Sequence, residues 1–114
     1  MSANKEYLQN ERNKEWRAEL RKKIANKERT LMVRTRMPEM DPVVRIRYQD
    51  KEVNTGLTEE QAQSEASRCL DCANPTCIEG CPVSINIPKF VKYIEQGSFL
   101  EAAKTLKETS ALPA

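Results

Sequence analysis

Four cysteines that lie within thirteen residues form the part of this sequence that could do chemistry. Their spacing is C-x2-C-x4-C-x3-C-P, and they are Cys69, Cys72, Cys77 and Cys81. Close spacing of this kind allows several thiolates to converge on one centre, because the intervening backbone can loop around it. The residues between them include small and turn-forming types that permit tight bends and offer backbone N–H groups to sulfur: Ala73, Asn74, Pro75 and Gly80.

Three kinds of site are compatible with this cysteine pattern. A disulfide framework is disfavoured, because the N-terminus carries no apolar secretory segment and disulfides are rare in reducing compartments. Four thiolates are enough for a tetrahedral zinc ion, but zinc modules usually pair two C-x2-C units, and this sequence has a single one. Bacterial ferredoxins bind [4Fe–4S] clusters through C-x2-C-x2-C-x3-C-P, whose middle gap alone differs from this pattern. The spacing therefore favours iron–sulfur ligation and leaves zinc as the second interpretation.

The number of cysteines limits what an iron–sulfur site could be. In the ferredoxin pattern the last cysteine ligates a different cluster from the first three, so two clusters need about eight ligands. The chain contains four cysteines. Either one cluster takes all four, or this sequence is part of a longer one. The final residues, 110–114, show no helix-ending pattern, and we expect the chain to be truncated there.

Several other functions are excluded by composition. The chain has no histidine, which rules out Ser-His and Cys-His catalytic pairs and histidine metal ligands. With only three glycines, no Gly-rich nucleotide-binding loop can be written. No apolar run approaches the roughly 18 residues of a membrane span. Asp71 and Glu79 flank the cysteines without a carboxylate partner, so we assign them no catalytic role.

The first 36 residues form a basic segment. They hold 11 Lys and Arg against five Glu, a net charge of +6, whereas residues 37–114 carry −4. Few helix breakers occur in residues 4–32, so we predict one long helix there, with Trp16, Leu20 and Ile24 on its apolar stripe. This helix is too polar to be covered by the small remainder of the chain, and we expect it to project or to lie on a surface outside this chain. Its basic residues are diluted by glutamates and have no aromatic ladder beside them, so we expect no nucleic-acid partner.

An irregular connection is predicted between this helix and the rest of the chain, over residues 37–57. Pro38 and Pro42 prevent a continuous helix, because each proline moves its predecessor out of the α region. The connection ends where Thr58 and Gln61 form a capping box, which predicts a helix running to about Cys69.

Two further helices are predicted after the cysteines. Pro88 is well placed at the first position of a helix that runs from Pro88 to about Gln96, and Gly97 suits the left-handed residue that ends it. Ser98 and Glu101 form a second capping box, which predicts a helix to about residue 108. No stretch alternates for long enough to predict a strand. The class is therefore mainly α, with residues 58–114 as a partial helical domain around a cysteine-rich loop.

These motifs, taken in order, resemble a known family. Residues 37–114 are similar to the N-terminal iron–sulfur domain of the glutamate synthase small (beta) subunit and of related NADPH-linked flavoproteins. The resemblance rests on Met37-Pro-Glu-Met-Asp-Pro42, Gly56-Leu-Thr-Glu-Glu60, Glu65-Ala-Ser-Arg-Cys-Leu-Asp-Cys72, Gly80-Cys-Pro-Val83, Ile87-Pro88 and Leu112-Pro113.

The resemblance implies an α-helical ferredoxin fold that holds two [4Fe–4S] clusters, one ligated by Cys69, Cys72 and Cys77 and the other by Cys81. It implies an electron-transfer and docking domain, not catalytic alone, that relays electrons between a flavin and a partner such as a glutamate synthase large subunit or another redox protein. The FAD and NADPH sites belong to a flavoprotein body that would follow this chain, and the clusters could be incomplete here. The alternative from another class is a helical interaction module, zinc-stapled or metal-free. Reduced thiols without a targeting signal indicate the cytoplasm.

Overall fold

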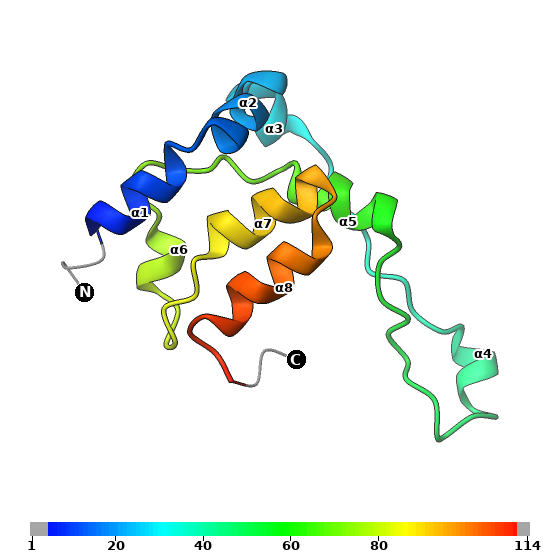
Figure 1. The fold of residues 1–114 in the computed structure, drawn as a ribbon. Helices are drawn as coiled ribbons and strands as arrows, with labels where there is room; N and C mark the ends of the chain where they lie inside the picture. The colour runs from blue at the N-terminus through cyan, green and yellow to red at the C-terminus, as the bar shows by residue number, and fades with distance from the viewer. Residues whose placement is uncertain (1–4, 112–114) are drawn as a thin grey trace.

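The computed structural model describes residues 5–111, which fold into helices and loops (Figure 1). The helices are α1 Lys5–Arg12, α2 Glu15–Lys23, α3 Asn26–Leu31, α4 Pro42–Arg45, α5 Glu59–Ala66, α6 Thr76–Glu79, α7 Ile87–Gln96 and α8 Phe99–Lys107. Within this range there is no strand, only an isolated antiparallel bridge between Glu39 and Asn54. The predicted mainly α class is confirmed. Leu112 and Pro113, which contributed to the resemblance, lie outside the described residues.

The antiparallel pair α7 and α8 forms the centre of the molecule (Figure 1). Asn86 caps α7 by accepting a hydrogen bond from the Lys89 N–H, and Gly97 ends it with a φ of +91°. The predicted second capping box is wrong: in the described structure the Ser98 side chain accepts no hydrogen bond from the first turn of α8. Packing against α7 holds α8 instead, with Ala102 only 3% exposed.

Helix α5 packs against α7 and leads into the cysteine loop. Its N-terminus is the capping box expected from the sequence. The Gln61 N–H donates to the Thr58 hydroxyl (3.2 Å), and the Thr58 N–H donates to the Gln61 side-chain oxygen (3.0 Å). Ala66, the last residue of α5, is buried. The chain then reaches Cys69, whose carbonyl accepts a hydrogen bond from Lys92 of α7.

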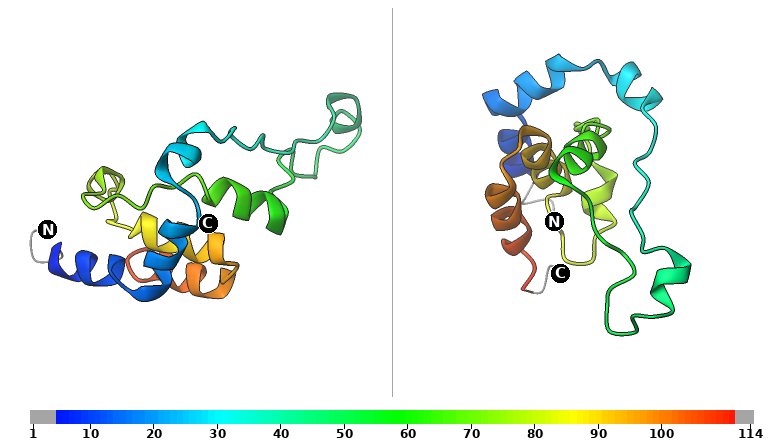
Figure 2. Two further views of the ribbon diagram at one scale, coloured as in Figure 1. Left: turned by 90° about the horizontal axis from the view of Figure 1, so that it is seen from above. Right: turned by 90° about the vertical axis from the view of Figure 1, so that its right-hand side faces the viewer.

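The N-terminal segment is not the single helix predicted for residues 4–32. It forms the three short helices α1, α2 and α3, and Ile24 at the end of α2 takes an extended backbone. These breaks allow the segment to bend around the helical body, where α2 packs on α7 (Figures 1 and 2). Leu20 is buried there, and Trp16 contacts Tyr93 of α7. The expectation that this segment projects is therefore wrong as well, because its arginines are paired with groups of the same chain.

Residues 37–57 project from the body as an arm that carries α4 (Figures 1 and 2). Its two sides are joined where the Met40 N–H donates to the Val53 carbonyl (2.7 Å) and the Thr55 N–H to the Pro38 carbonyl (3.0 Å). Several large apolar side chains of the arm are exposed, Ile46 by 77%. None of the helices in the described range has the length and apolar character to cross a membrane.

Candidate metal centre

The four cysteines lie on the segment that runs from the end of α5, through the short helix α6, to the start of α7. Cys69 and Cys81 are partly buried, whereas Cys72 and Cys77 are exposed. In the described structure all four are free thiols. The disulfide interpretation is therefore not the arrangement seen here, and each sulfur is chemically available as a ligand.

Cys69, Cys72 and Cys77 form a group whose thiols influence one another. Burial raises the pKa of the Cys69 thiol, and the neighbouring Cys72 adds to that rise. Burial also raises the pKa of Cys77, and the charges of Cys69 and Cys72 raise it further. These three side chains therefore lie near enough for the charge of one to affect another.

Cys81 lies in a different electrostatic environment. Its pKa is lowered, mainly by backbone N–H groups of Ile85 and Val83, which stabilise the thiolate. No influence from the other three cysteines contributes to this shift. Cys81 lines a groove of about 750 Å³ that extends along α1 and the end of α8. The groove wall includes Asn86, whose buried Nδ2 has no hydrogen-bond partner among the described residues.

The thiols of Cys69, Cys72 and Cys77 are chemically suited to an iron–sulfur cluster, since thiolate is the ligand that such clusters take. They are not drawn together around a common point, however. Across residues 5–111 no three or more His, Cys, Asp or Glu side chains are close enough to hold one metal ion. Ligation by Cys69, Cys72, Cys77 and Cys81 therefore stays a prediction.

A buried acidic residue between two of the cysteines is the feature that sequence reasoning missed. The Asp71 side chain is fully buried and forms ion pairs with Arg17 and Arg21 of α2. The basic excess of the N-terminal segment was the only available signal, and it did not indicate which carboxylate these arginines would meet. The N-terminal segment thus covers the cysteine loop.

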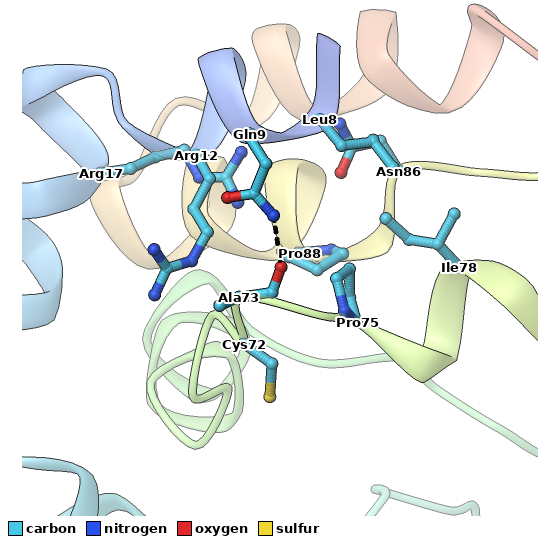
Figure 3. Close-up of a pocket in the computed structure, with 10 residues that line it drawn as sticks. All are labelled: Leu8, Gln9, Arg12, Arg17, Cys72, Ala73, Pro75, Ile78, Asn86 and Pro88. Atoms are coloured by element: carbon cyan, nitrogen blue, oxygen red, sulfur yellow. Dashed lines mark hydrogen bonds between the residues drawn. The ribbon is translucent and has the colours of Figure 1, made fainter. Parts of the chain in front are cut away.

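Side chains of α1 also bind the backbone of this loop (Figure 3). Arg12 Nε donates to the Asp71 carbonyl (2.9 Å), and Gln9 Nε2 donates to the Ala73 carbonyl (2.6 Å). A cavity of about 10 Å³ lies here, and its lining includes Arg17 and Cys72. This volume is close to that of one water molecule. The exposed Cys72 is therefore attached to the body through its neighbours.

On the other side of the loop lies a buried group of charges on α7. Lys92 Nζ donates to the Cys69 carbonyl (2.8 Å) and lies 3.4 Å from a Glu95 carboxylate oxygen. The same carboxylate pairs with Arg29 of α3, which also donates to the Ser67 carbonyl. Arg68, next to Cys69 in sequence, instead forms an ion pair with Glu65.

Comparison with known proteins identifies a family for this part of the chain. Residues 45–114 match the family described as dihydropyrimidine dehydrogenase domain II, 4Fe-4S cluster. The chain is 40% identical over 62 residues to the glutamate synthase (NADPH) small chain of Escherichia coli, which covers 54% of this chain and 13% of that protein. It is 35% identical over 78 residues to the corresponding small chain of Azospirillum brasilense, covering 68% of this chain and 16% of the relative.

A second kind of relative is a dehydrogenase subunit. The NAD-dependent dihydropyrimidine dehydrogenase subunit PreT of Salmonella typhimurium is 40% identical over 63 residues, which covers 55% of this chain and 15% of that protein. No solved structure was found to match the chain. The matched region spans only 13–16% of the length of these relatives. The family match covers more than half of the chain and includes all four cysteines. This chain therefore belongs to the family described as dihydropyrimidine dehydrogenase domain II, 4Fe-4S cluster, and it is similar to the glutamate synthase small chains.

Proposed function

We propose that this chain is the electron-transfer and docking domain of an NADPH-dependent oxidoreductase of the glutamate synthase small-subunit type. A [4Fe–4S] cluster exchanges single electrons, so it can connect a two-electron flavin with the redox centre of a partner protein. The FAD and NADPH sites would lie in a flavoprotein body outside this chain, so the chain alone would not be catalytic. Free thiols are compatible with a location in the cytoplasm.

The observation that carries this proposal is the match of residues 45–114, which include all four cysteines, to a 4Fe-4S domain family. Cys69, Cys72 and Cys77 influence one another electrostatically, whereas Cys81 is influenced by backbone N–H groups instead. This division parallels the ferredoxin pattern, in which the last cysteine serves a different cluster. We assign the first three to one [4Fe–4S] cluster and Cys81 to a second one; the fourth ligand of the first cluster and the other three ligands of the second would come from outside this chain.

The partner would be a large subunit like that of glutamate synthase, or another redox protein. The exposed lysines of the N-terminal segment, Lys22, Lys23 and Lys27, remain available for an acidic partner surface, since its buried arginines are used internally. Replacing these three lysines by glutamate should weaken binding of the partner, most clearly at low salt. Unchanged affinity would remove this segment from the interface.

The test of the ligand assignment uses the full-length protein, purified anaerobically and reconstituted with iron and sulfide. Iron, acid-labile sulfide and zinc are counted per chain, and the absorbance near 400 nm is recorded. The expected result is iron with matching sulfide. Cys77→Ser should lower the iron content and electron delivery, and Cys81→Ser should spare the cluster of the three-cysteine group.

Three outcomes would contradict the proposal. Zinc without sulfide, or no metal after reconstitution, would indicate the helical interaction module. Iron content and electron delivery unchanged in Cys77→Ser would exclude this cysteine as a ligand. Complete loss of iron in both Cys77→Ser and Cys81→Ser would show one cluster bound by all four cysteines and would refute the division, under which each variant keeps the cluster that the other loses.

A further inference from the structure

The carboxylate of Asp71 is held by two arginines from a distant part of the chain. Arg17 Nη2 contacts Asp71 Oδ1, Arg17 Nε donates to Oδ2 (3.3 Å), and Arg21 Nη1 donates to Oδ2 (2.7 Å). Asp71 is 0% exposed and Arg17 is 2% exposed. A fork-shaped pair of this kind fixes both position and orientation, because the guanidinium plane matches the carboxylate.

The backbone of the same loop is held at alternate carbonyls. Lys92 donates to the carbonyl of Cys69, Arg12 to that of Asp71, and Gln9 to that of Ala73. Side chains of α1 and α7 therefore fix the loop backbone by hydrogen bonds at Asp71 and at one position on each side of it. The Cys72 backbone lies between two of these anchored carbonyls, so its side chain is given a defined starting direction.

Asp71 adopts a backbone conformation that needs such support. Its φ is +51°, in the left-handed region that residues other than glycine rarely occupy. A left-handed backbone at a residue other than glycine persists only where surrounding contacts hold it, and such residues are concentrated at functional sites. The left-handed residue lies two positions after Cys69 and directly before Cys72. The direction of both thiols therefore depends on Asp71.

Arg17 has one further hydrogen-bond donor group, which does not contact Asp71. The Nη1 group is buried and has no hydrogen-bond partner among the described residues. Arg17 also lines the small cavity to which Cys72 contributes (Figure 3). Buried donors without an acceptor are costly, so an acceptor at this place is favoured.

We propose that Arg17 and Arg21 are positioning residues for the iron–sulfur ligands Cys69 and Cys72, and that they act through the buried Asp71. This inference rests on the proposed ligation of a cluster by these cysteines. It extends the site to the N-terminal segment, which precedes the 45–114 family match. Groups around the ligands of a metal commonly orient them and tune the metal. With two arginines against one aspartate, this cluster of side chains also leaves one positive charge beside the site.

The experiment compares Arg17→Gln with Arg68→Gln. Arg68 is also an arginine near Cys69, but its ion pair is with Glu65 and not with the loop. In the metal-free full chain, alkylation of each cysteine is followed by mass spectrometry. Arg17→Gln should speed alkylation of the partly buried Cys69 at least about tenfold relative to Cys81, because loss of a buried ion-pair partner releases the loop. Arg68→Gln should leave this ratio unchanged.

A second readout separates positioning from mere stability. In protein reconstituted with iron and sulfide, removal of the Arg17 charge should lower the midpoint potential of the cluster, since a nearby cation favours the more negative reduced state. Arg17→Lys keeps the charge but lacks the fork, so it should restore much of the potential while Cys69 stays more reactive. If Arg17→Gln does not fold, the partly exposed Arg21→Gln is used for both measurements.

Equal alkylation ratios and equal potentials in the Arg17→Gln and Arg68→Gln proteins would overturn the inference. Failure of the ligand assignment itself gives a different result, namely a wild-type protein that takes up no iron. In that case the alkylation ratio still decides whether Arg17 holds the cysteine loop.

Discussion

Trp16 of α2 stacks on Tyr93 of α7, with ring centroids 4.3 Å apart and ring planes inclined by 17°. The two residues come from opposite ends of the sequence. Their contact attaches the N-terminal segment to the helical hairpin, on the same helix α2 that supplies Arg17 and Arg21 to the cysteine loop. The stack therefore links the stability of the fold to the geometry of the proposed site.

Replacing Trp16 by alanine should destabilise the protein by about 2–4 kcal/mol, because a large aromatic contact is lost. Trp16→Phe keeps a stacked ring and should cost less than about 1.5 kcal/mol. Urea unfolding followed by circular dichroism gives both values. Tyr48→Ala, which removes an exposed ring on the arm, serves as the control and should change stability little. Equal losses in Trp16→Ala and Tyr48→Ala would show that the stack does not hold α2.

Gly97 should not tolerate a side chain. Its φ is +91°, and a Cβ there would lie 2.8 Å from Gln63 Nε2. Gly97→Ala should therefore cost about 1–2 kcal/mol, mostly from backbone strain. Gly80→Ala is the matched control, because Gly80 has an ordinary helical φ and its nearest contact would be 3.5 Å. A lower melting temperature is expected in the first variant only; a larger loss in Gly80→Ala would contradict this account.

Features set by neighbouring residues could be predicted from the sequence. Thr58 and Gln61 cap α5, and Gly97 ends α7, because these signals act over three or four positions. The bends of the N-terminal segment could not be predicted in this way. They depend on contacts such as that of Arg17 with Asp71, 54 positions along the chain. The sequence pattern of a polar helix predicts that it is exposed to solvent, because the distant residues that form its buried ion pairs cannot be identified from that pattern.

In the candidate site, too, the sequence predicted local features but not those that depend on packing. Cysteine spacing located the four thiols and indicated their chemistry. It could not show that Cys81 lies in a separate environment, nor that Asp71 is held by α2, since both follow from packing. Ligation itself depends on a cluster that brings its own binding energy, and metal sites commonly complete their geometry only on binding.

Thr58 and Ser98, which precede the first turns of α5 and α8, provide a direct test of local stabilisation. Thr58→Ala removes a capping box that is formed, and it should cost about 1 kcal/mol. Ser98→Ala changes a position whose side chain makes no cap hydrogen bond in the described structure, and it should stay within about 0.5 kcal/mol. Chemical denaturation of both variants measures the difference. Equal costs would mean that Ser98 caps α8 in solution after all.

Lys92 should stabilise the fold from beneath the cysteine loop. It is fully buried and donates to the Cys69 carbonyl, while burial lowers its pKa despite the nearby Glu95. Lys92→Met removes the donor but leaves Glu95 paired with Arg29, so the expected cost is about 1–3 kcal/mol. Lys104→Met, at an exposed position of α8, is the control. If both variants unfold at the same urea concentration, the Lys92 hydrogen bond contributes nothing measurable.

Acid should weaken the fold through two carboxylates with lowered pKa values. Burial raises the pKa of Glu11, but Lys14 and Lys89 lower it more, and the net pKa lies below the ordinary 4.5. The pKa of Glu65 is lowered chiefly by the Thr35 backbone N–H, 2.7 Å from its carboxylate. The unfolded chain therefore binds protons more tightly at these groups, and the stabilisation is present above pH 4.5 and is lost as the pH falls through the folded pKa values.

Urea unfolding between about pH 6 and pH 3, followed by the fluorescence of the single tryptophan, measures this effect. The free energy of unfolding should fall with pH, and Glu65→Gln should flatten the fall because it removes one of the two groups. Glu19→Gln makes the same chemical change at an exposed position of α2 and should follow the wild-type curve. A Glu65→Gln curve parallel to that of Glu19→Gln would show that the Thr35 contact does not bias this carboxylate.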